Sequence, residues 1–334
     1  MKISFFLISI LFLVSCNKDN EEEENNPLPT DIDFKQEMRD FVISISQYTK
    51  NIAPGFIIIP QNGQELVTQN GNEDGEPETG YLNAIDGVGR EDLFYGYDED
   101  NQATSTTDNK YMISFLDICK QSGLKVLVTD YCSDHPKMDN SYSQNELKGY
   151  ISFAAPSREL DVIPDYPAIP YHSNNDTISL IEKAKNFLYI INPDKFDSKQ
   201  SFINAIEQTN YDLLIIDSYF NEEPFDNAEI EALKMKKSGE KRLVISYLSI
   251  GEAENYRYYW QDEWNTNRPA WLYKENPEWE GNFKVWYWDE NWQSIIFGND
   301  SSCLKKILDA GFDGAYLDII DAFEYFEDIA VDKK

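Results

Sequence analysis

The apolar residues of the chain gather in short continuous runs that are separated by polar segments. Residues 56–60, 187–191 and 211–216 are clear examples. Such runs are typical of parallel strands buried on both faces, whereas a strand with one solvent-facing side alternates apolar and polar residues. The runs predict strands at 56–60, 84–89, 125–129, 150–154, 187–191, 211–216, 242–247 and 314–317.

Helical spacing of apolar residues fills several of the intervals. Residues 34–48 carry apolar side chains three or four positions apart, so the folded part is expected to open with a helix that Pro54 and Gly55 end. Further helices are predicted at 111–120, 177–184, 202–208, 228–237 and 303–310. Eight strands alternating with helices or loops indicate an α/β fold, a (β/α)8 TIM barrel that occupies residues 34–334 as a single domain. A doubly wound open sheet is the alternative.

The first 33 residues have the pattern of a targeting segment. Lys2 precedes an apolar run at 3–14 that is too short to span a bilayer, and Ser15 and Cys16 follow. Residues 13–16 (LVSC) resemble a bacterial lipobox, which predicts a lipoprotein signal peptide at 1–16, lipidation of Cys16 and anchoring to the outer membrane at the cell surface. An ordinary signal peptide is the alternative. Residues 17–33 are polar and acidic, so they are expected to form a disordered tether.

The composition excludes several classes of partner. Sixty acidic against 29 basic residues give a net charge of −31, which repels nucleic acid and anionic lipid and could attract a polymer with free amines. No Gly-x-Gly-x-x-Gly or P-loop motif favours a nucleotide cofactor. Two histidines, three cysteines besides Cys16 and no C-x-x-C predict no metal site, no cofactor and at most one disulfide. No obligate protein partner is evident.

Most of the predicted strands end in polar side chains. The carboxyl ends of parallel barrel strands meet on one face, where barrel enzymes hold their active sites, so we expect these side chains to converge. Helix capping is the alternative for any one of them. The residues are Gln61 and Asn62, Glu91 and Asp92, Asp130, Asp217, Glu252 and Glu254, and Asp318 and Asp321.

Carboxylates without a usable histidine or Cys–His pair favour glycoside hydrolysis, which needs only two carboxyl groups. If the last strand, 314–318, pairs with the first, 56–60, the barrel closes and the last and second strands flank the first. Asp318 and Glu91 then lie on either side of Asn62, a geometry that can set two carboxyls at the roughly 5 Å of a retaining pair. A metal-dependent deacetylase is disfavoured by the histidine count.

Aromatic residues are concentrated after the seventh predicted strand. All seven tryptophans lie between 260 and 292, and several tyrosines accompany them. Aromatic rings suit stacking on sugar faces, and two or three of these residues, Trp260 among them, are expected to touch a ligand. The alternative is a small satellite core beneath a long loop.

Four segments together resemble the endo-α-1,4-polygalactosaminidase-like proteins of glycoside hydrolase family 114. They are 247–260 (YLSIGEAENYRYYW), 311–321 (GFDGAYLDIID), 59–63 (IPQNG) and 86–95 (DGVGREDLFY). The resemblance covers nearly all of 36–328, but in a different order, because family members normally begin near the segment at 187. It therefore implies a circularly permuted TIM barrel, in which residues 34–175 supply the usual second half.

The resemblance also implies roles for single residues. Asp318 would be the nucleophile and Glu91 the general acid/base of a retaining endo-glycoside hydrolase that acts on an amino-sugar, galactosamine-type polysaccharide. Residues 316–319 and 89–92 depart from the family's pattern around these two acids. The alternative is a non-catalytic glycan-binding surface lipoprotein that uses the segment 260–292. The expected substrate-binding residues are Asn62, Gln61, Asp130, Asp217, Tyr247, Glu252, Glu254, Arg257 and Trp260.

Overall fold

The structure, a computed structural model, describes residue 29 and residues 31–332. The predicted signal peptide 1–16 with Cys16, and most of the tether 17–33, lie outside the described residues and stay predictions. Residues from Ile32 onward group into one unit, which is described here by itself. Within residues 29 and 31–332, none of the helices combines the length and the apolar character needed to cross a membrane.

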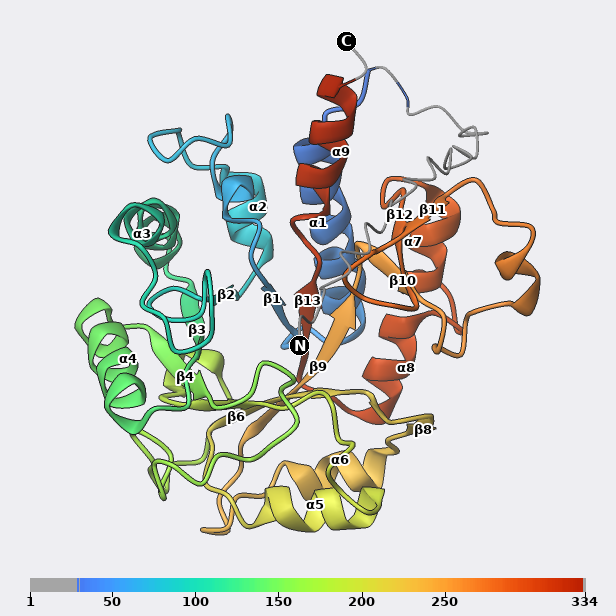
Figure 1. Ribbon diagram of the computed structural model, residues 1–334. Coiled ribbons are helices and arrows are strands. Elements are labelled where there is room, and N and C mark those ends of the chain that lie inside the picture. The colour runs from blue at the N-terminus through green and yellow to red at the C-terminus, as the bar shows by residue number, and fades with distance from the viewer. Residues whose placement is uncertain (1–28, 30, 333–334) are drawn as a thin grey trace, which may run out of the picture. The chain divides into compact units, whose positions relative to one another are not determined.

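Parallel strands form the centre of this unit (Figure 1). One sheet contains β1 (Ile57–Pro60), β13 (Gly314–Asp318), β9 (Leu243–Ser249), β6 (Leu213–Asp217) and β5 (Phe187–Tyr189), in that spatial order. A second sheet contains β2 (Gly87–Glu91), β3 (Lys125–Tyr131) and β4 (Ile151–Ala155). Almost every side chain of these strands is buried, which explains why their sequences are continuous apolar runs.

The first and last strands lie side by side, as the sequence predicted. β1 and β13 pair in parallel with a register that runs from Ile57 opposite Gly314 to Pro60 opposite Leu317. Gly314 permits the close approach, because a Cβ atom there would lie 2.4 Å from the carbonyl oxygen of Ile57. The last strand of the chain therefore sits between β1 and β9.

The two sheets meet along two seams. At the first, the backbone N–H of Asn62 donates to the carbonyl oxygen of Gly89 at 2.9 Å, so β2 neighbours β1. At the second, β4 and β5 contact through Phe153 and Phe187, whose ring centroids are 5.7 Å apart. No hydrogen-bonded ladder joins β4 to β5 in the part of the chain that the structure describes. The strand order is consistent with a TIM barrel, while a fully hydrogen-bonded closure is not observed.

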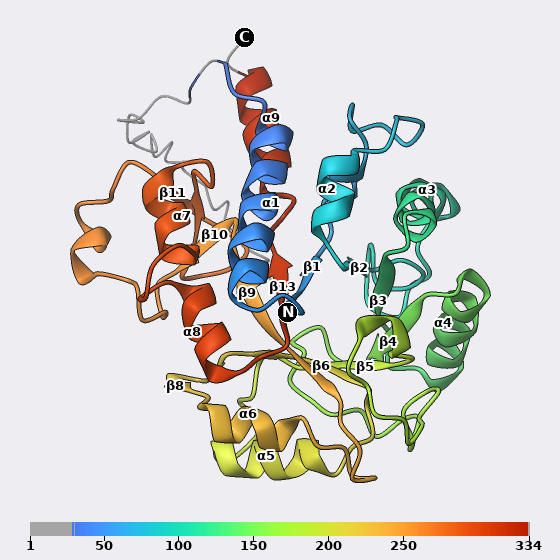
Figure 2. The same ribbon diagram turned by 180° about the vertical axis from the view of Figure 1, so that it is seen from behind.

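Helices cover the outside of the strands (Figures 1 and 2). The first and last of them, α1 and α9, run side by side in both views, and the rings of Phe34 and Phe326 stack at 5.8 Å. Lys35 also pairs with Glu327 between these helices. The two ends of the described chain are therefore neighbours in helices as well as in strands. The helices are α1 (Phe34–Ile52), α2 (Thr79–Ala84), α3 (Thr106–Gln121), α4 (His135–Lys148), α5 (Lys199–Glu207), α6 (Asn227–Leu233), α7 (Glu290–Ile296), α8 (Cys303–Ala310) and α9 (Ala322–Asp332).

Two predicted elements differ from the structure, and one helix of the structure, α4, was not predicted. The helix expected at 177–184 is reduced to one 3₁₀ turn at Ile181–Lys183, because the backbone N–H of Ile178 donates instead to the carbonyl of Lys241. The strand expected at 84–89 begins only at Gly87, after α2 has ended. α4 was not predicted, because its buried face includes Ser141 and Asn145 and so lacks an apolar stripe.

The segment after β9 forms a small aromatic core of its own. Its strands β10 (Glu252–Glu254), β12 (Asn282–Val285) and β11 (Leu272–Glu275) make an antiparallel sheet. Trp264, Trp271 and Trp292 are buried there, and the indole N–H of Trp292 donates to the carbonyl of Ile250 at 2.8 Å. Most tryptophans of the chain therefore pack a satellite core, the alternative that the sequence left open.

Candidate functional site

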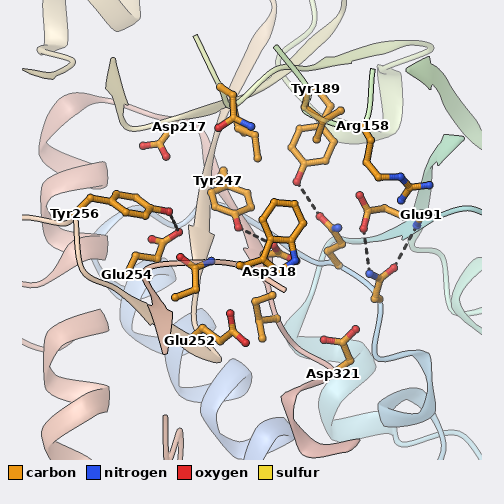
Figure 3. A pocket seen from close by; sticks show the side chains of 18 of the residues that line it. Glu91, Arg158, Tyr189, Asp217, Tyr247, Glu252, Glu254, Tyr256, Asp318 and Asp321 are labelled. Carbon is orange, nitrogen blue, oxygen red and sulfur yellow. Dashed lines mark hydrogen bonds between the residues drawn. The ribbon is translucent and has the colours of Figure 1, made fainter. Parts of the chain in front are cut away.

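A cavity of about 450 Å³ opens where β1, β2, β6, β9 and β13 end (Figure 3). Nine of the eleven residues predicted to act in catalysis or substrate binding line it. Residues more than 200 positions apart in sequence thus meet at the carboxyl ends of the strands, where an active site is expected. The nine are Gln61, Asn62, Glu91, Asp217, Tyr247, Glu252, Glu254, Arg257 and Asp318.

Asp318 is the last residue of β13. The hydroxyl of Tyr247, on the neighbouring strand β9, donates to its Oδ2 atom at 2.6 Å (Figure 3). The next residue, Ile319, has φ +58°, an unusual value for a β-branched residue and one that is often found beside active sites. Burial, and secondly the charge of Glu91, raise the pKa of Asp318 to about 7, although the Tyr247 hydrogen bond lowers it.

Glu91 ends β2 and is held from two sides. Asn62 accepts from the backbone N–H of Glu91 at 3.2 Å and donates its amide to Oε2 at 3.3 Å, and the hydroxyl of Tyr131 donates to Oε1. Asn62 itself adopts a left-handed backbone, φ 60°, which Asn tolerates better than most residues. The carboxylate is therefore oriented by an amide and a phenol.

Asp318 and Glu91 come from the two strands that flank β1, with Asn62 between them, as the sequence predicted. They are close enough for the charge of Glu91 to raise the pKa of Asp318. A third carboxyl, Asp321, lines the same cavity, and burial raises its pKa to about 6 against the opposing effect of Arg90. Asp318 and Asp321 therefore both hold their protons to higher pH than an ordinary aspartate does.

A second group of charges lies beside Asp318. Arg257 donates two hydrogen bonds to Asp217, at 2.9 and 2.7 Å, and its Nε donates to Glu254 at 2.5 Å. The hydroxyl of Tyr256 donates to the other oxygen of Glu254 at 2.6 Å. Such a bidentate arginine–carboxylate pair fixes the orientation of both Arg257 and Asp217. The arrangement gives this wall of the cavity a rigid shape.

Glu252 lines the cavity but is almost fully buried. It is 2% exposed, and its Oε1 accepts from Asn276 at 2.9 Å and from Lys284 at 3.1 Å. Its Oε2 is buried and has no hydrogen-bond partner within residues 29 and 31–332. A buried carboxylate oxygen is costly to leave unpaired, so Oε2 adds to the free-energy cost of burying Glu252 beside the cavity.

The structure does not bring Asp130 or Trp260 into the cavity. Asp130 is fully buried and accepts from the backbone N–H groups of Phe94 and Tyr95 and from Ser141 and Asn145. It therefore holds the loop after β2 against α4. Trp260 packs on the rings of Trp264 and Phe283 in the satellite core.

Other residues line the cavity that sequence reasoning did not single out. Arg158 donates hydrogen bonds to the carboxylate of Asp92 and to the carbonyl of Gly96. Its guanidinium carbon lies 3.9 Å from the centre of the Tyr131 ring. No motif marks this loop arginine. Trp279, 54% exposed, is the tryptophan that lines the cavity, and only its membership of the aromatic segment could have indicated it.

Cysteines and metal ligands add no further chemistry. Cys119, Cys132 and Cys303 are buried free thiols. Across the described residues 29 and 31–332, no group of three or more His, Cys, Asp or Glu side chains could hold a metal ion.

Replacing Asp318 by Asn should stabilise the fold at high pH. The folded-state pKa of about 7 exceeds the ordinary 3.8, so the folded state binds more protons and its stability falls as pH rises through this window. An Asn side chain does not ionise, so the variant does not lose stability over this pH range. Its free energy of unfolding should exceed wild type by about 1–3 kcal/mol at pH 8, less than the ~4 kcal/mol of three pKa units, because the cavity is open to solvent.

Urea denaturation at pH 4 and pH 8 measures this difference. The gain should fall to about 0.5 kcal/mol at pH 4, where the carboxyl is protonated in the folded state and only partly protonated in the unfolded state. The matched change at the exposed Asp98, Asp98→Asn, should alter stability by less than about 0.5 kcal/mol at both pH values. An equal gain for Asp318→Asn at the two pH values would contradict the assignment.

Comparisons with known proteins bear on the C-terminal half. Residues 179–334 match the sequence model of Glycoside-hydrolase family GH114. An uncharacterized protein of Methanocaldococcus jannaschii is 40% identical over 163 residues, 48% of this chain and 44% of that protein. An uncharacterized protein of Deinococcus radiodurans is 40% identical over 126 residues, 37% of this chain and 38% of that protein. The chain thus spans less than half the length of the curated relatives that it matches.

Among solved structures, the Aspergillus fumigatus protein Ega3 in complex with galactosamine is similar over 48% of this chain and 51% of its own, with 19% identity and a TM-score of 0.29. That likeness is too low to bear on fold or activity. The sequence match is the stronger finding, and it agrees with the resemblance seen in the motifs. Over residues 179–334, which include Asp318 and the segment from Tyr247 to Trp260, the chain is similar to glycoside hydrolase family GH114.

Proposed function

We propose that the protein is a retaining endo-glycoside hydrolase that acts on an amino-sugar polysaccharide of the galactosamine type, with Asp318 as nucleophile and Glu91 as general acid/base. The observation that carries the proposal is the position of these two acids, on the strands that flank β1 and in one cavity. The family match over residues 179–334 supports glycosidase chemistry.

Two displacements at the anomeric carbon would complete the reaction. In the first, the carboxylate of Asp318 attacks the anomeric carbon, while the Glu91 carboxyl gives its proton to the departing glycosidic oxygen. This leaves a glycosyl ester on Asp318 and a carboxylate on Glu91. In the second, Glu91 takes a proton from water, the water oxygen bonds to the anomeric carbon, and the ester breaks to restore Asp318.

The hydrogen bonds of the site fit these roles. Tyr247 donates to Oδ2 of Asp318 and so orients the carboxylate that would attack. Asn62 and Tyr131 keep Glu91 oriented while it changes protonation state. Protonating Glu91 removes a charge that raises the pKa of Asp318, so the productive state, with Glu91 neutral, favours an ionised nucleophile.

The charge of the cavity supports a substrate with amines. Seven acidic residues line it against two arginines, Arg158 and Arg257. Arg257 is already paired with two carboxylates, and Glu252 has an oxygen without a partner among the described residues. Free ammonium groups on a sugar polymer would offset this negative potential.

Incubation with α-1,4-linked galactosamine polymer tests the proposal. New reducing ends should appear, and proton NMR of the first products should show the anomeric configuration of the substrate. Products of inverted configuration would exclude Asp318 as a nucleophile. Binding without cleavage would favour the alternative, a glycan-binding protein in which the exposed Trp279 is the aromatic contact.

We further propose that the chain is a circularly permuted TIM barrel. Its first and last strands pair, its first and last helices pack together, and the family match begins at residue 179, near the seam expected at 175–176. A ring of strands tolerates such a change because only the position of the opened loop differs.

Restoring the usual order should give a folded protein. Residue 332 would be joined to residue 34 by about eight flexible residues, because Phe326 already contacts Phe34 and the rest of α9 rises only ~1.5 Å per residue. New ends between Ala168 and Ile169 lie in an exposed segment without helix or strand. Circular dichroism should show cooperative thermal unfolding within about 10 °C of wild type.

The matched control opens the same joined chain between Leu127 and Val128, inside β3, and should not fold. If the rearrangement opened at 168/169 also failed to fold, the proposal of a permuted barrel would be refuted.

A further inference from the structure

A second cavity continues the first on the side of Asp217. Its volume is about 560 Å³, and it shares Ile191, Asn192, Asp217, Tyr256 and Arg257 with the catalytic cavity. Asp217 and Tyr256 mark this side of the close-up in Figure 3. The two cavities together are larger than one sugar unit needs, so a chain of sugars has a continuous path past the Asp217–Arg257 pair.

Exposed aromatic rings line the second cavity. Tyr256 is 58% and Tyr258 42% exposed, although large apolar rings are more often covered. Their positions are fixed: the hydroxyl of Tyr256 donates to Glu254, and that of Tyr258 donates to the carbonyl of Ser301 at 2.7 Å. Tyr219 lies parallel to Tyr258, with 6.2 Å between centroids and 16° between planes. Arg257 lies over the Tyr256 ring and Lys306 over the Tyr258 ring, 5.2 and 4.5 Å from the ring centres, so a sugar can stack only on the part of each ring that stays exposed.

The charges of the second cavity resemble those of the first. Asp194, Asp217 and Glu222 line it against the single arginine Arg257. Because Arg257 is committed to Asp217 and Glu254, the cavity keeps a negative balance from the exposed Asp194 and Glu222. Flat apolar faces beside carboxylates match a pyranose ring that carries an ammonium group.

We propose that this second cavity is a distal subsite that binds amino-sugar units of the same chain, stacked on Tyr258 and paired with Asp194 and Glu222. The inference rests on the proposed function for its choice of ligand. A distal subsite makes the affinity for a substrate depend on chain length. An acidic cleft with such a subsite selects long cationic chains over short ones.

Binding of α-1,4-linked galactosamine oligosaccharides of two to eight units, measured by calorimetry, tests the proposal. The measurements use an Asp318→Asn background, so they do not depend on cleavage. Affinity should rise with length until the second cavity is filled. Tyr258→Ala should reduce the ratio of long-chain to short-chain affinity about three- to tenfold, while Tyr258→Phe, which keeps the ring, should preserve the ratio.

Charge is tested with Asp194→Asn combined with Glu222→Gln. This variant should bind long galactosamine chains about threefold or more weakly at low salt. Its affinity for the N-acetylated chains should be unchanged. Affinity that does not rise with length, or equal losses for short and long chains in Tyr258→Ala, would overturn the proposal. If wild-type protein cleaves nothing but the length dependence remains, the glycosidase proposal fails and the distal subsite stands.

Discussion

Asp318→Asn is expected to lower the rate of polymer cleavage at least about 10³-fold, because the amide cannot form the glycosyl ester. Glu91→Gln should lower it about 10²- to 10⁴-fold on unactivated polymer, since the leaving oxygen then departs without a proton. Release of reducing ends measures both. Circular dichroism should show native folding, because each substitution keeps the size of a side chain at the edge of a cavity.

Azide distinguishes the two roles. In Asp318→Ala, azide can enter the space left by the carboxylate and attack the anomeric carbon directly, which gives a glycosyl azide of inverted configuration. In Glu91→Ala, azide attacks the ester on Asp318 and the product keeps the configuration of the substrate. An activated leaving group, such as a fluoride, is needed in the second case because no acid remains.

Asp321→Asn is the matched control, since Asp321 is a third carboxyl of the same cavity and also has a raised pKa, about 6. Its substitution should change the rate less than about tenfold if Asp318 and Glu91 carry the chemistry. Full activity in Asp318→Asn or Glu91→Gln, or a loss in Asp321→Asn as large as theirs, would refute the assignment.

The strands were predictable because their burial leaves a simple signature. A parallel strand covered on both faces must be apolar throughout, and β5, β6 and β9 all lie within or overlap the predicted runs. The amphipathic helix α8 was predicted with its observed bounds, Cys303–Ala310. α4 was not, because its buried Ser141 and Asn145 serve the carboxylate of Asp130 rather than an apolar core.

The site was predictable to the level of strand ends but not of side-chain direction. Successive residues of a strand point to opposite faces, so a shift of one position changes what a residue can reach. β3 continues to Tyr131, whose hydroxyl reaches Glu91, while the preceding Asp130 turns to α4. The same limit applies to the tryptophans: Trp260 and Trp279 belong to one aromatic segment, but only Trp279 lines the cavity.

A fully buried ion pair fixes the course of residues 174–176. Lys236 and Asp212 have no exposed side-chain surface, and their charged atoms are 2.5 Å apart. Asn174 donates to both oxygens of Asp212, and Lys236 donates to the carbonyl of Asp176 at 2.9 Å. Asn174 and Asp176 thus supply hydrogen bonds to the buried charges of Asp212 and Lys236, and these bonds fix the course of the segment.

Lys236→Met should lower the free energy of unfolding by about 3–5 kcal/mol, because it leaves the buried carboxylate of Asp212 without the lysine that pairs with it directly. The amide of Asn174 and the backbone N–H of Lys185 still donate to Asp212, but neither is charged. Urea denaturation at neutral pH measures the loss. Adding Asp212→Asn should recover part of it, since the double variant lacks both charges of this pair.

The matched control is Lys137→Met, which breaks an exposed pair of similar length, 2.7 Å to Asp134, with side chains 38% and 58% exposed. Its cost should stay below about 1 kcal/mol, because water screens both charges and holding two long side chains together costs entropy. The two pairs have similar N–O distances, so the difference between the two losses of unfolding free energy reports the effect of burial. If both substitutions cost the same, the network around Asp212 does not determine the course of residues 174–176.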